Sequence, residues 1–191
     1  MLKRRLAITW LGWVVAGLAL IAIPVSNHLT LMAAMSQMRF VAMDSRDTFY
    51  LGNMGSFETA QHIHAELARM AAETIFSRNP DGYDDPERLE RLFNPATAAA
   101  LNKDAARDAD VFRAQQVHQK VETGQIRELS VDSNTALVSI EGQVLKTGIF
   151  NGRIVNDAKK VTVFLRLTIN GDMAHNGRYP LVVTNYEERF E

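Results

Sequence analysis

The chain of 191 residues contains no cysteine, which excludes a disulfide, a thiolate nucleophile and a cysteine-ligated zinc site. It also lacks an excess of charge of either sign, since 21 Lys and Arg stand against 22 Asp and Glu. This balance gives no general attraction to nucleic acid or to acidic lipid. Because no basic stripe is interleaved with aromatic residues, we expect no stable nucleic-acid binding.

Motifs that would hold a cofactor or a metal are missing as well. The glycine-containing stretch at 52–56, GNMGS, has neither the lysine nor the preceding strand of a phosphate-binding loop. His62 and His64 lie two apart on a predicted helix, so their side chains point roughly 200° apart and cannot share a metal ion. We therefore expect no cofactor and no metal, with His64 on the apolar helix face and His62 in solvent.

One long apolar run is present near the N-terminus. Residues 6–25 carry no charge, and a helix of about 20 residues spans the ~30 Å hydrocarbon core of a bilayer. Trp10 and Trp13 lie in the first half of this run, where indole rings serve as interfacial membrane anchors. The run predicts a transmembrane helix.

The charges beside this run predict its direction. Lys3, Arg4 and Arg5 precede the run, and the next fixed positive charge is Arg39. By the positive-inside rule, residues 1–5 stay in the cytoplasm and the rest of the chain crosses a bacterial inner membrane into the periplasm.

A cleaved signal peptide is the alternative to a retained anchor, because it has the same basic start. The apolar run is longer than such a peptide needs, and the Pro-Val-Ser-Asn sequence at 24–27 is a poor cleavage site. Ala33 and Ala34 offer a more distant one. The sequence favours retention.

The segment at 26–56 reads as a stalk followed by a linker. Apolar residues keep helical spacing through Met43, and Met32 and Met35 either face a partner or belong to a plain spacer. The remaining residues to position 56 include Gly52 and Gly55 and indicate a linker.

Residues 57–191 then form one domain. A first helix runs from 57 to about 75, with Ser56 as its predicted N-cap. Asp85-Pro86 and Asn94-Pro95 start two more helices. Alternating apolar residues indicate strands at 121–132, 134–150, 161–169 and 181–189, with a bend or bulge at Gly142 and hairpin turns at Asn151-Gly152 and Asn170-Gly171. Three helices before four antiparallel strands predict an α+β domain with its helices on one face of a curved sheet.

Three stretches carry a family resemblance: KDAARDADVFRAQQVHQKVETGQI from Lys103, SIEGQVLKTGIFNGRIVNDAKKVTVFLRLTI from Ser139, and YPLVVTNYEE from Tyr179. They resemble the charged helix and first strand, the central hairpin and the final strand of the TraE family of conjugative transfer, a relative of the VirB-eight proteins. Family members often carry an aromatic residue soon after the Lys-Thr pair, whereas Gly148 follows Thr147 here. The resemblance implies a nuclear-transport-factor-2-like fold.

The resemblance also implies a non-enzymatic scaffold of a type IV secretion system. Such a protein self-associates in the inner membrane and binds other inner-membrane and periplasmic components. Arg107 and Asp108, in a helix of alternating charge, are candidate interface residues; a solvated helix face is the simpler interpretation.

Two other functions stay open. A tethered ligand-binding or enzymatic module would need an inward carboxylate or tyrosine, for which residue type alone suggests Tyr83, Tyr179, Asp110 and Glu122. A cell-envelope adaptor outside secretion has the same sequence requirements as the scaffold.

Overall fold

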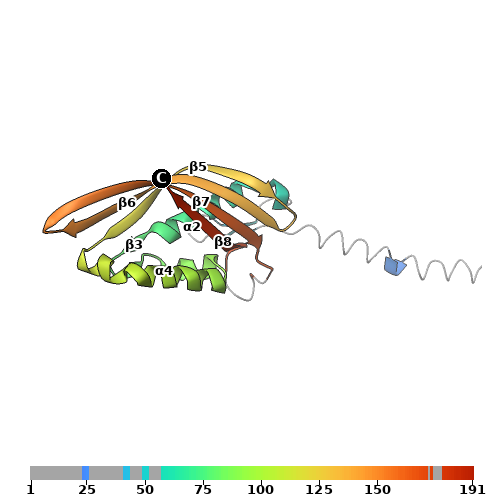
Figure 1. Cartoon of the computed structure of the whole chain (residues 1–191). Helices are drawn as coiled ribbons and strands as arrows, with labels where there is room; N and C mark the ends of the chain where they lie inside the picture. The colour runs from blue at the N-terminus through green and yellow to red at the C-terminus, as the bar shows by residue number, and fades with distance from the viewer. Residues whose placement is uncertain (1–22, 26–40, 44–48, 52–56, 172, 174–177) are drawn as a thin grey trace, which may run out of the picture.

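The structure, a computed structural model, describes residues 23–25, 41–43, 49–51, 57–171, 173 and 178–191 (Figure 1). Of the predicted transmembrane helix only 23–25 belongs to this set, and these three residues are helical. No helix within the described ranges is long and apolar enough to cross a bilayer. The predictions for seven residues lie outside the described part: Lys3, Arg4, Arg5, Trp10, Trp13, Met32 and Met35.

A six-stranded antiparallel sheet with the order β4-β3-β5-β6-β7-β8 dominates the domain. Its members are β3 (Arg78–Asn79), β4 (Gly82–Tyr83), β5 (His118–Val131), β6 (Thr135–Phe150), β7 (Arg153–Ile169) and β8 (Leu181–Phe190). The four predicted strands are confirmed. The strands β3 and β4 were not predicted, because the Asn-Pro-Asp-Gly stretch at 79–82 indicated only the end of a helix, whereas it also forms the turn of a short hairpin.

Three α-helices lie on one side of this curved sheet, as Figure 1 shows for α2 and α4. They are α2 (Gln61–Phe76), α3 (Pro86–Leu92) and α4 (Pro95–Ala114), and a 3-10 turn, η1 (Phe57–Thr59), precedes α2. The predicted α+β class is therefore confirmed, with the helices on one face of the sheet.

The proline-started helices are capped as their sequences predict. The Asp85 carboxylate accepts a hydrogen bond from the backbone N–H of Arg88 at 2.8 Å, and the Asn94 side chain accepts one from Thr97 at 2.7 Å. The Ser56 prediction was wrong. The helix α2 starts later than predicted because the η1 turn precedes it, with the Ala60 N–H donating to the Phe57 carbonyl. Its N-cap is therefore Ala60, which makes no side-chain hydrogen bond.

Part of the predicted stalk and linker is extended. The strands β1 (Val41–Met43) and β2 (Phe49–Leu51) pair antiparallel, with Val41 opposite Leu51. The helical prediction for 41–43 was therefore wrong, as was the linker prediction for 49–51. β-branched and aromatic residues in both segments favour extended backbone over helix.

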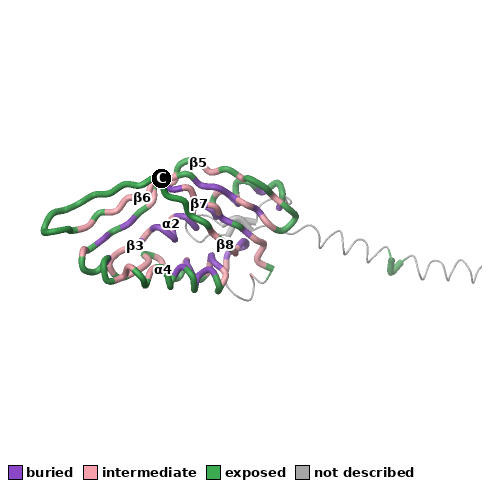
Figure 2. Tube along the Cα trace, in the orientation of Figure 1, coloured by how far each residue is buried: buried purple, intermediate pink, exposed green. Residues whose placement is uncertain are grey.

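The core fills the space between the helices and the inner face of the sheet, where Figure 2 shows the buried segments. The predicted stripe of α2 is buried, including Leu67, Ala71 and Ile75, and so are Leu89 and Leu92 of α3. The predicted alternation of β7 is confirmed, since its buried members are Val161, Val163, Leu165 and Leu167.

The β6–β7 hairpin continues beyond this core. Asn151 and Gly152 both have positive φ, 50° and 73°, as a two-residue hairpin turn requires. β7 starts at Arg153, eight residues before the predicted strand, and residues 153–160 are all exposed. In Figure 2 this hairpin forms an arm projecting from the body, in which β7 is green and β6 is partly pink.

The predicted irregularity at Gly142 is confirmed as a bulge between β5 and β6. Thr123 pairs with Gly142 and Ile126 with Ile140, so the extra residue belongs to β5. The bulge brings the two backbones together: a Cβ on Gly142 would lie 2.7 Å from the carbonyl oxygen of Glu122. Only glycine fits at this position without a backbone shift.

Candidate functional site

A cavity of about 360 Å³ lies between α4 and the inner face of the sheet. Its hydrophobic wall comes from the end of α2 and from Leu101. Besides Arg107, seven of the side chains that line it are charged or phenolic. These seven are Arg78, Tyr83, Asp104, Asp108, Lys146, Tyr186 and Glu188. These polar side chains line a partly open cavity at the edge of the core.

An arginine–aspartate pair closes one side of the cavity. Arg78, only 8% exposed, donates to Asp108 with Nη2–Oδ1 at 2.7 Å and Nη1–Oδ2 at 3.2 Å. Its Nη2 also donates to the Ala105 carbonyl, and its guanidinium carbon lies 4.1 Å from the Phe112 ring centroid. Asp108 thus attaches α4 to β3 within the domain.

Two tyrosines in the cavity hold their protons tightly. The Tyr83 hydroxyl donates to the Leu101 carbonyl at 3.0 Å, and the Tyr186 hydroxyl donates to the Asp104 carboxylate at 3.3 Å. Burial raises the pKa of each phenol to about 12; for Tyr186 the Asp104 charge adds to this effect. Both groups are therefore hydrogen-bond donors at neutral pH and cannot act as bases.

Glu188 is the carboxylate most affected by this environment. Burial raises its pKa, the Asp104 charge raises it further, and Lys146 partly opposes the shift. The cavity therefore offers a polar molecule both hydrogen-bond donors and a partly buried carboxylate. The other two acidic side chains of the cavity already form ion pairs: Asp104 with Arg107 at 2.8 Å, and Asp108 with Arg78.

Only one of the four residues suggested for a pocket lies in this cavity. Tyr83 lines it, whereas Tyr179 is buried in the core beneath Arg91, Asp110 is fully exposed on α4, and Glu122 lies on the outer face of the sheet. The suggestion of an inward group was therefore wrong for Asp110 and Glu122, while Tyr179 does point inward but lies outside this cavity.

The sequence analysis missed Tyr186 and Glu188 because a bulge changes the parity of β8. Leu167 pairs with Val183 but Arg166 pairs with Asn185, which leaves Thr184 as the extra residue. Simple alternation from Val183 would direct Asn185 inward, whereas the bulge directs Tyr186 inward instead. The only sequence signal of this change in parity is that an aromatic residue, Tyr186, lies three positions after Val183 and not two.

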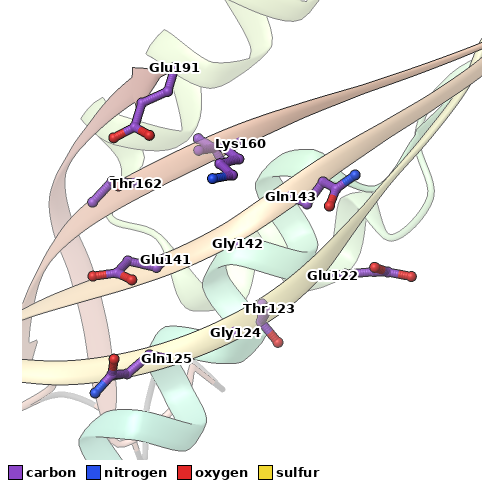
Figure 3. Close-up of a pocket in the computed structure, with 11 residues that line it drawn as sticks. Glu122, Thr123, Gly124, Gln125, Glu141, Gly142, Gln143, Lys160, Thr162 and Glu191 are labelled. Atoms are coloured by element: carbon purple, nitrogen blue, oxygen red, sulfur yellow. The ribbon is translucent and has the colours of Figure 1, made fainter.

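A second, open depression of about 620 Å³ lies on the outer face of the sheet (Figure 3). Its side chains come from β5, β6 and β7 around the bulge at Gly124 and Gly142. The charged members are Glu122, Glu141, Glu191 and Lys160, and Figure 3 shows them projecting from the side of the sheet opposite the helices. This arrangement is a shallow acidic surface, not an enclosed site.

The histidines behave as their spacing predicts. His64 is completely buried and His62 is exposed. The His64 Nδ1 lies 2.6 Å from Glu128 Oε2, a contact that joins α2 to β5. Within the described ranges no group of three or more acidic or histidine side chains is arranged to hold a metal ion.

Arg107 remains accessible for an interaction. Its side chain is 70% exposed, and its ion pair with Asp104 is a surface contact of neighbouring helical turns. The proposed partner surface on α4 stays a prediction for Arg107, while Asp108 is half-exposed and already paired with Arg78.

No family model matches the sequence, and no curated protein matches it. The similarity is one of structure: solved structures share this fold, a helical layer on a curled antiparallel sheet. The solved structures that share it include an IcmL-like type IV secretion system protein from Legionella pneumophila subsp. pneumophila str. Philadelphia 1, the periplasmic domain of DotI and a periplasmic fragment of TraM.

The extent of the match is nearly the same for all three structures. The IcmL-like protein is 15% identical with a TM-score of 0.53, and the alignment covers 72% of this chain and 96% of that one. For DotI the identity is 15%, the TM-score 0.52 and the coverage 71% and 99%. For TraM the identity is 10%, the TM-score 0.52 and the coverage 70% of this chain and 99% of that one. Identities this low show a shared fold, not a shared function.

Proposed function

We propose that this chain is a non-enzymatic assembly component of the inner-membrane complex of a type IV secretion system, acting in conjugative DNA transfer. Its apolar N-terminal segment anchors it, and residues 57–191 present surfaces to further copies and to other components in the periplasm. Anchoring concentrates the domains at the membrane, so that weak contacts between them suffice for assembly.

The observation that carries this proposal is the shared fold. One solved structure of this fold is a type IV secretion system protein, and the two others are the periplasmic domain of DotI and a periplasmic fragment of TraM. The segments that resemble the TraE family also form the expected elements: the charged helix is α4 leading into β5, the central hairpin is β6–β7, and the last segment is β8. These matches support TraE-like membership within the secretion class.

The site chemistry agrees with a binding role. In the cavity, Arg78 and Asp108 hold each other, and the two tyrosines cannot act as bases near neutral pH. Among the described residues that line this cavity, these four groups therefore supply no matched general acid and base.

Co-purification from detergent-solubilised membranes tests the proposal directly. The full chain should retain secretion-system ATPases and periplasmic components, identified by mass spectrometry. A chain lacking residues 1–25 should fold but lose these partners and its own oligomers. Recovery of only unrelated envelope proteins would instead indicate an adaptor outside secretion, and failure of the truncated chain to fold would show that anchor and domain are not independent.

A tethered ligand-binding module is the second candidate, and the cavity of about 360 Å³ is the observation that favours it. It requires a small molecule whose binding is saturable and is lost on Glu188→Gln or Tyr186→Phe. If both variants retain assembly and the parent chain binds no metabolite from a periplasmic extract, the cavity has no ligand role.

A further inference from the structure

The two edges of the β6–β7 hairpin are covered differently. Along β6, the strand β5 pairs as far as His118 opposite Thr147, and the N–H of Ile149 donates to the Gln115 carbonyl at 2.6 Å. Along β7, the strand β8 pairs only from Val161 onward, and the last contact is the Glu191 N–H donating to the Lys160 carbonyl at 3.1 Å. Within the described part of the chain, no strand pairs with the outer edge of residues 153–159.

The backbone of this edge is ready to accept a strand. The Lys160 carbonyl points to the side where β8 ends, and backbone groups alternate sides along an antiparallel strand. Ile154, Asn156 and Ala158 therefore direct their N–H and C=O groups to the open side. Such an edge is a template for another extended chain.

The hairpin also exposes apolar side chains beside this edge. The exposed fractions are 47% for Ile149, 55% for Phe150, 75% for Ile154 and 48% for Val155. The pairing places Ile149 and Ile154 on one face of the hairpin and Phe150 and Val155 on the other, so the tip is apolar on both faces.

We propose that this edge pairs antiparallel with the same edge of a second copy of the chain, with Val155 opposite Val155 of the second copy. This inference rests on the self-association in the proposed function and names its contact. A twofold contact of this kind is self-complementary, so it closes as a dimer.

The charges along the edge select this register. With Val155 at the centre, Arg153 of each copy faces Asp157 of the other, which gives two attractive cross-strand pairs. Centring on Asn156 would instead place Arg153 opposite Lys159, and centring on Asp157 would place two aspartates together. In the chosen register Ile154 and Asn156 exchange backbone hydrogen bonds, since both direct these groups outward.

The length of the open edge fits as well. In this register Gly152 of the second copy lies opposite Ala158, and its Asn151 lies opposite Lys159. The incoming strand therefore turns back just before Lys160, the residue at which pairing with the β8 side begins. The tip also lies at the end of the domain opposite η1 (Figure 1).

A single introduced cysteine tests the register, because the natural chain has none. Cα atoms of a facing non-hydrogen-bonded pair lie about 4.5 Å apart, within the range that a disulfide spans. The full-length Val155→Cys variant, in detergent and with mild oxidant, should form a disulfide dimer on a non-reducing gel. Ile154→Cys faces Asn156 in this register and should give about tenfold less dimer, as should Leu129→Cys, which is 50% exposed on β5.

Charge exchange provides an independent test in the Val155→Cys background. Asp157→Arg should lower the dimer yield about fivefold, because it places two arginines opposite each other. The double change Arg153→Asp with Asp157→Arg should restore the yield. All these side chains are exposed, and unchanged thermal unfolding confirms that the variants are folded.

Equal yields for the Val155, Ile154 and Leu129 cysteines, or no response to charge exchange, would overturn the proposed contact. Light scattering on the unmodified full chain separates this failure from failure of the proposed function. If the chain is oligomeric while Val155→Cys does not cross-link, the chain self-associates through another surface. A disulfide between Val155→Cys and a different protein would show that this edge binds that protein and not a second copy. A monomeric full chain would overturn both.

Discussion

The two halves of β7 have the same backbone pairing but different surroundings. Both halves pair without interruption to β6, from Arg153 opposite Phe150 to Thr168 opposite Thr135. In the half at 161–169, alternate side chains are buried under the helices, whereas the half at 153–160 has every side chain exposed. Strand formation therefore does not define the domain body; burial against the helical layer does, and the exposed half is free for contacts with other chains.

Replacing one side chain in each half should give the largest difference. Leu165→Ala removes a completely buried side chain and should lower the free energy of unfolding by about 2–5 kcal/mol. Ile154→Ala removes a mostly exposed one and should change it by less than about 0.5 kcal/mol. Urea unfolding followed by circular dichroism measures both. Similar losses would mean that the hairpin belongs to the cooperative core.

Gly142 marks the boundary between the two regions and should be the next most sensitive position. A Cβ there would lie 2.7 Å from a backbone oxygen, so Gly142→Ala should destabilise the fold by about 1–3 kcal/mol through a forced backbone shift. Gly171→Ala is the matched control, because nothing lies within 4 Å of the added atom. The same unfolding experiment applies, and an unchanged Gly142 variant would show that the bulge relaxes freely.

The ion pair at the cavity provides a smaller effect. Asp108→Asn weakens the two hydrogen bonds to the buried Arg78 and should cost about 1–2 kcal/mol. Asp110→Asn, two positions along the same helix, changes only an exposed pair with Arg113 and should leave the melting temperature unaltered. Equal melting temperatures for the two variants would contradict the structural role assigned to Asp108.

The pH dependence of stability should show the smallest effect. Because the folded pKa of Glu188 is raised, the folded state holds this proton more tightly than the unfolded state. Stability from this group is present below its ordinary pKa and is lost as pH rises through the raised value. Glu188→Gln should therefore gain melting temperature relative to the parent chain at neutral pH but not in acid.

The control for that measurement is Glu187→Gln. The Glu187 side chain neighbours Glu188 in sequence but lies on the opposite face of β8. The melting temperature of this variant should follow the parent chain across the same pH range. A parallel response of both variants would indicate a change in net charge alone.

Much of the fold could be predicted from local patterns. The Asp-Pro and Asn-Pro pairs located the starts of α3 and α4, and the alternation of β7 located its buried face, because capping and burial act on neighbouring residues. The cavity could not be predicted in this way. Tyr83, Asp104 and Glu188 are far apart in the sequence, and the parity of β8 depends on a bulge at Thr184.

By itself, the sequence determined the element types, the turn at Asn151-Gly152 and the N-terminal apolar run, since each depends on residues within one or two helical turns. Only the tertiary structure decided which half of β7 is covered and which edge stays open. The reason is that coverage depends on where β5, β8 and α4 end relative to one another, and these ends are brought together only when the chain is folded.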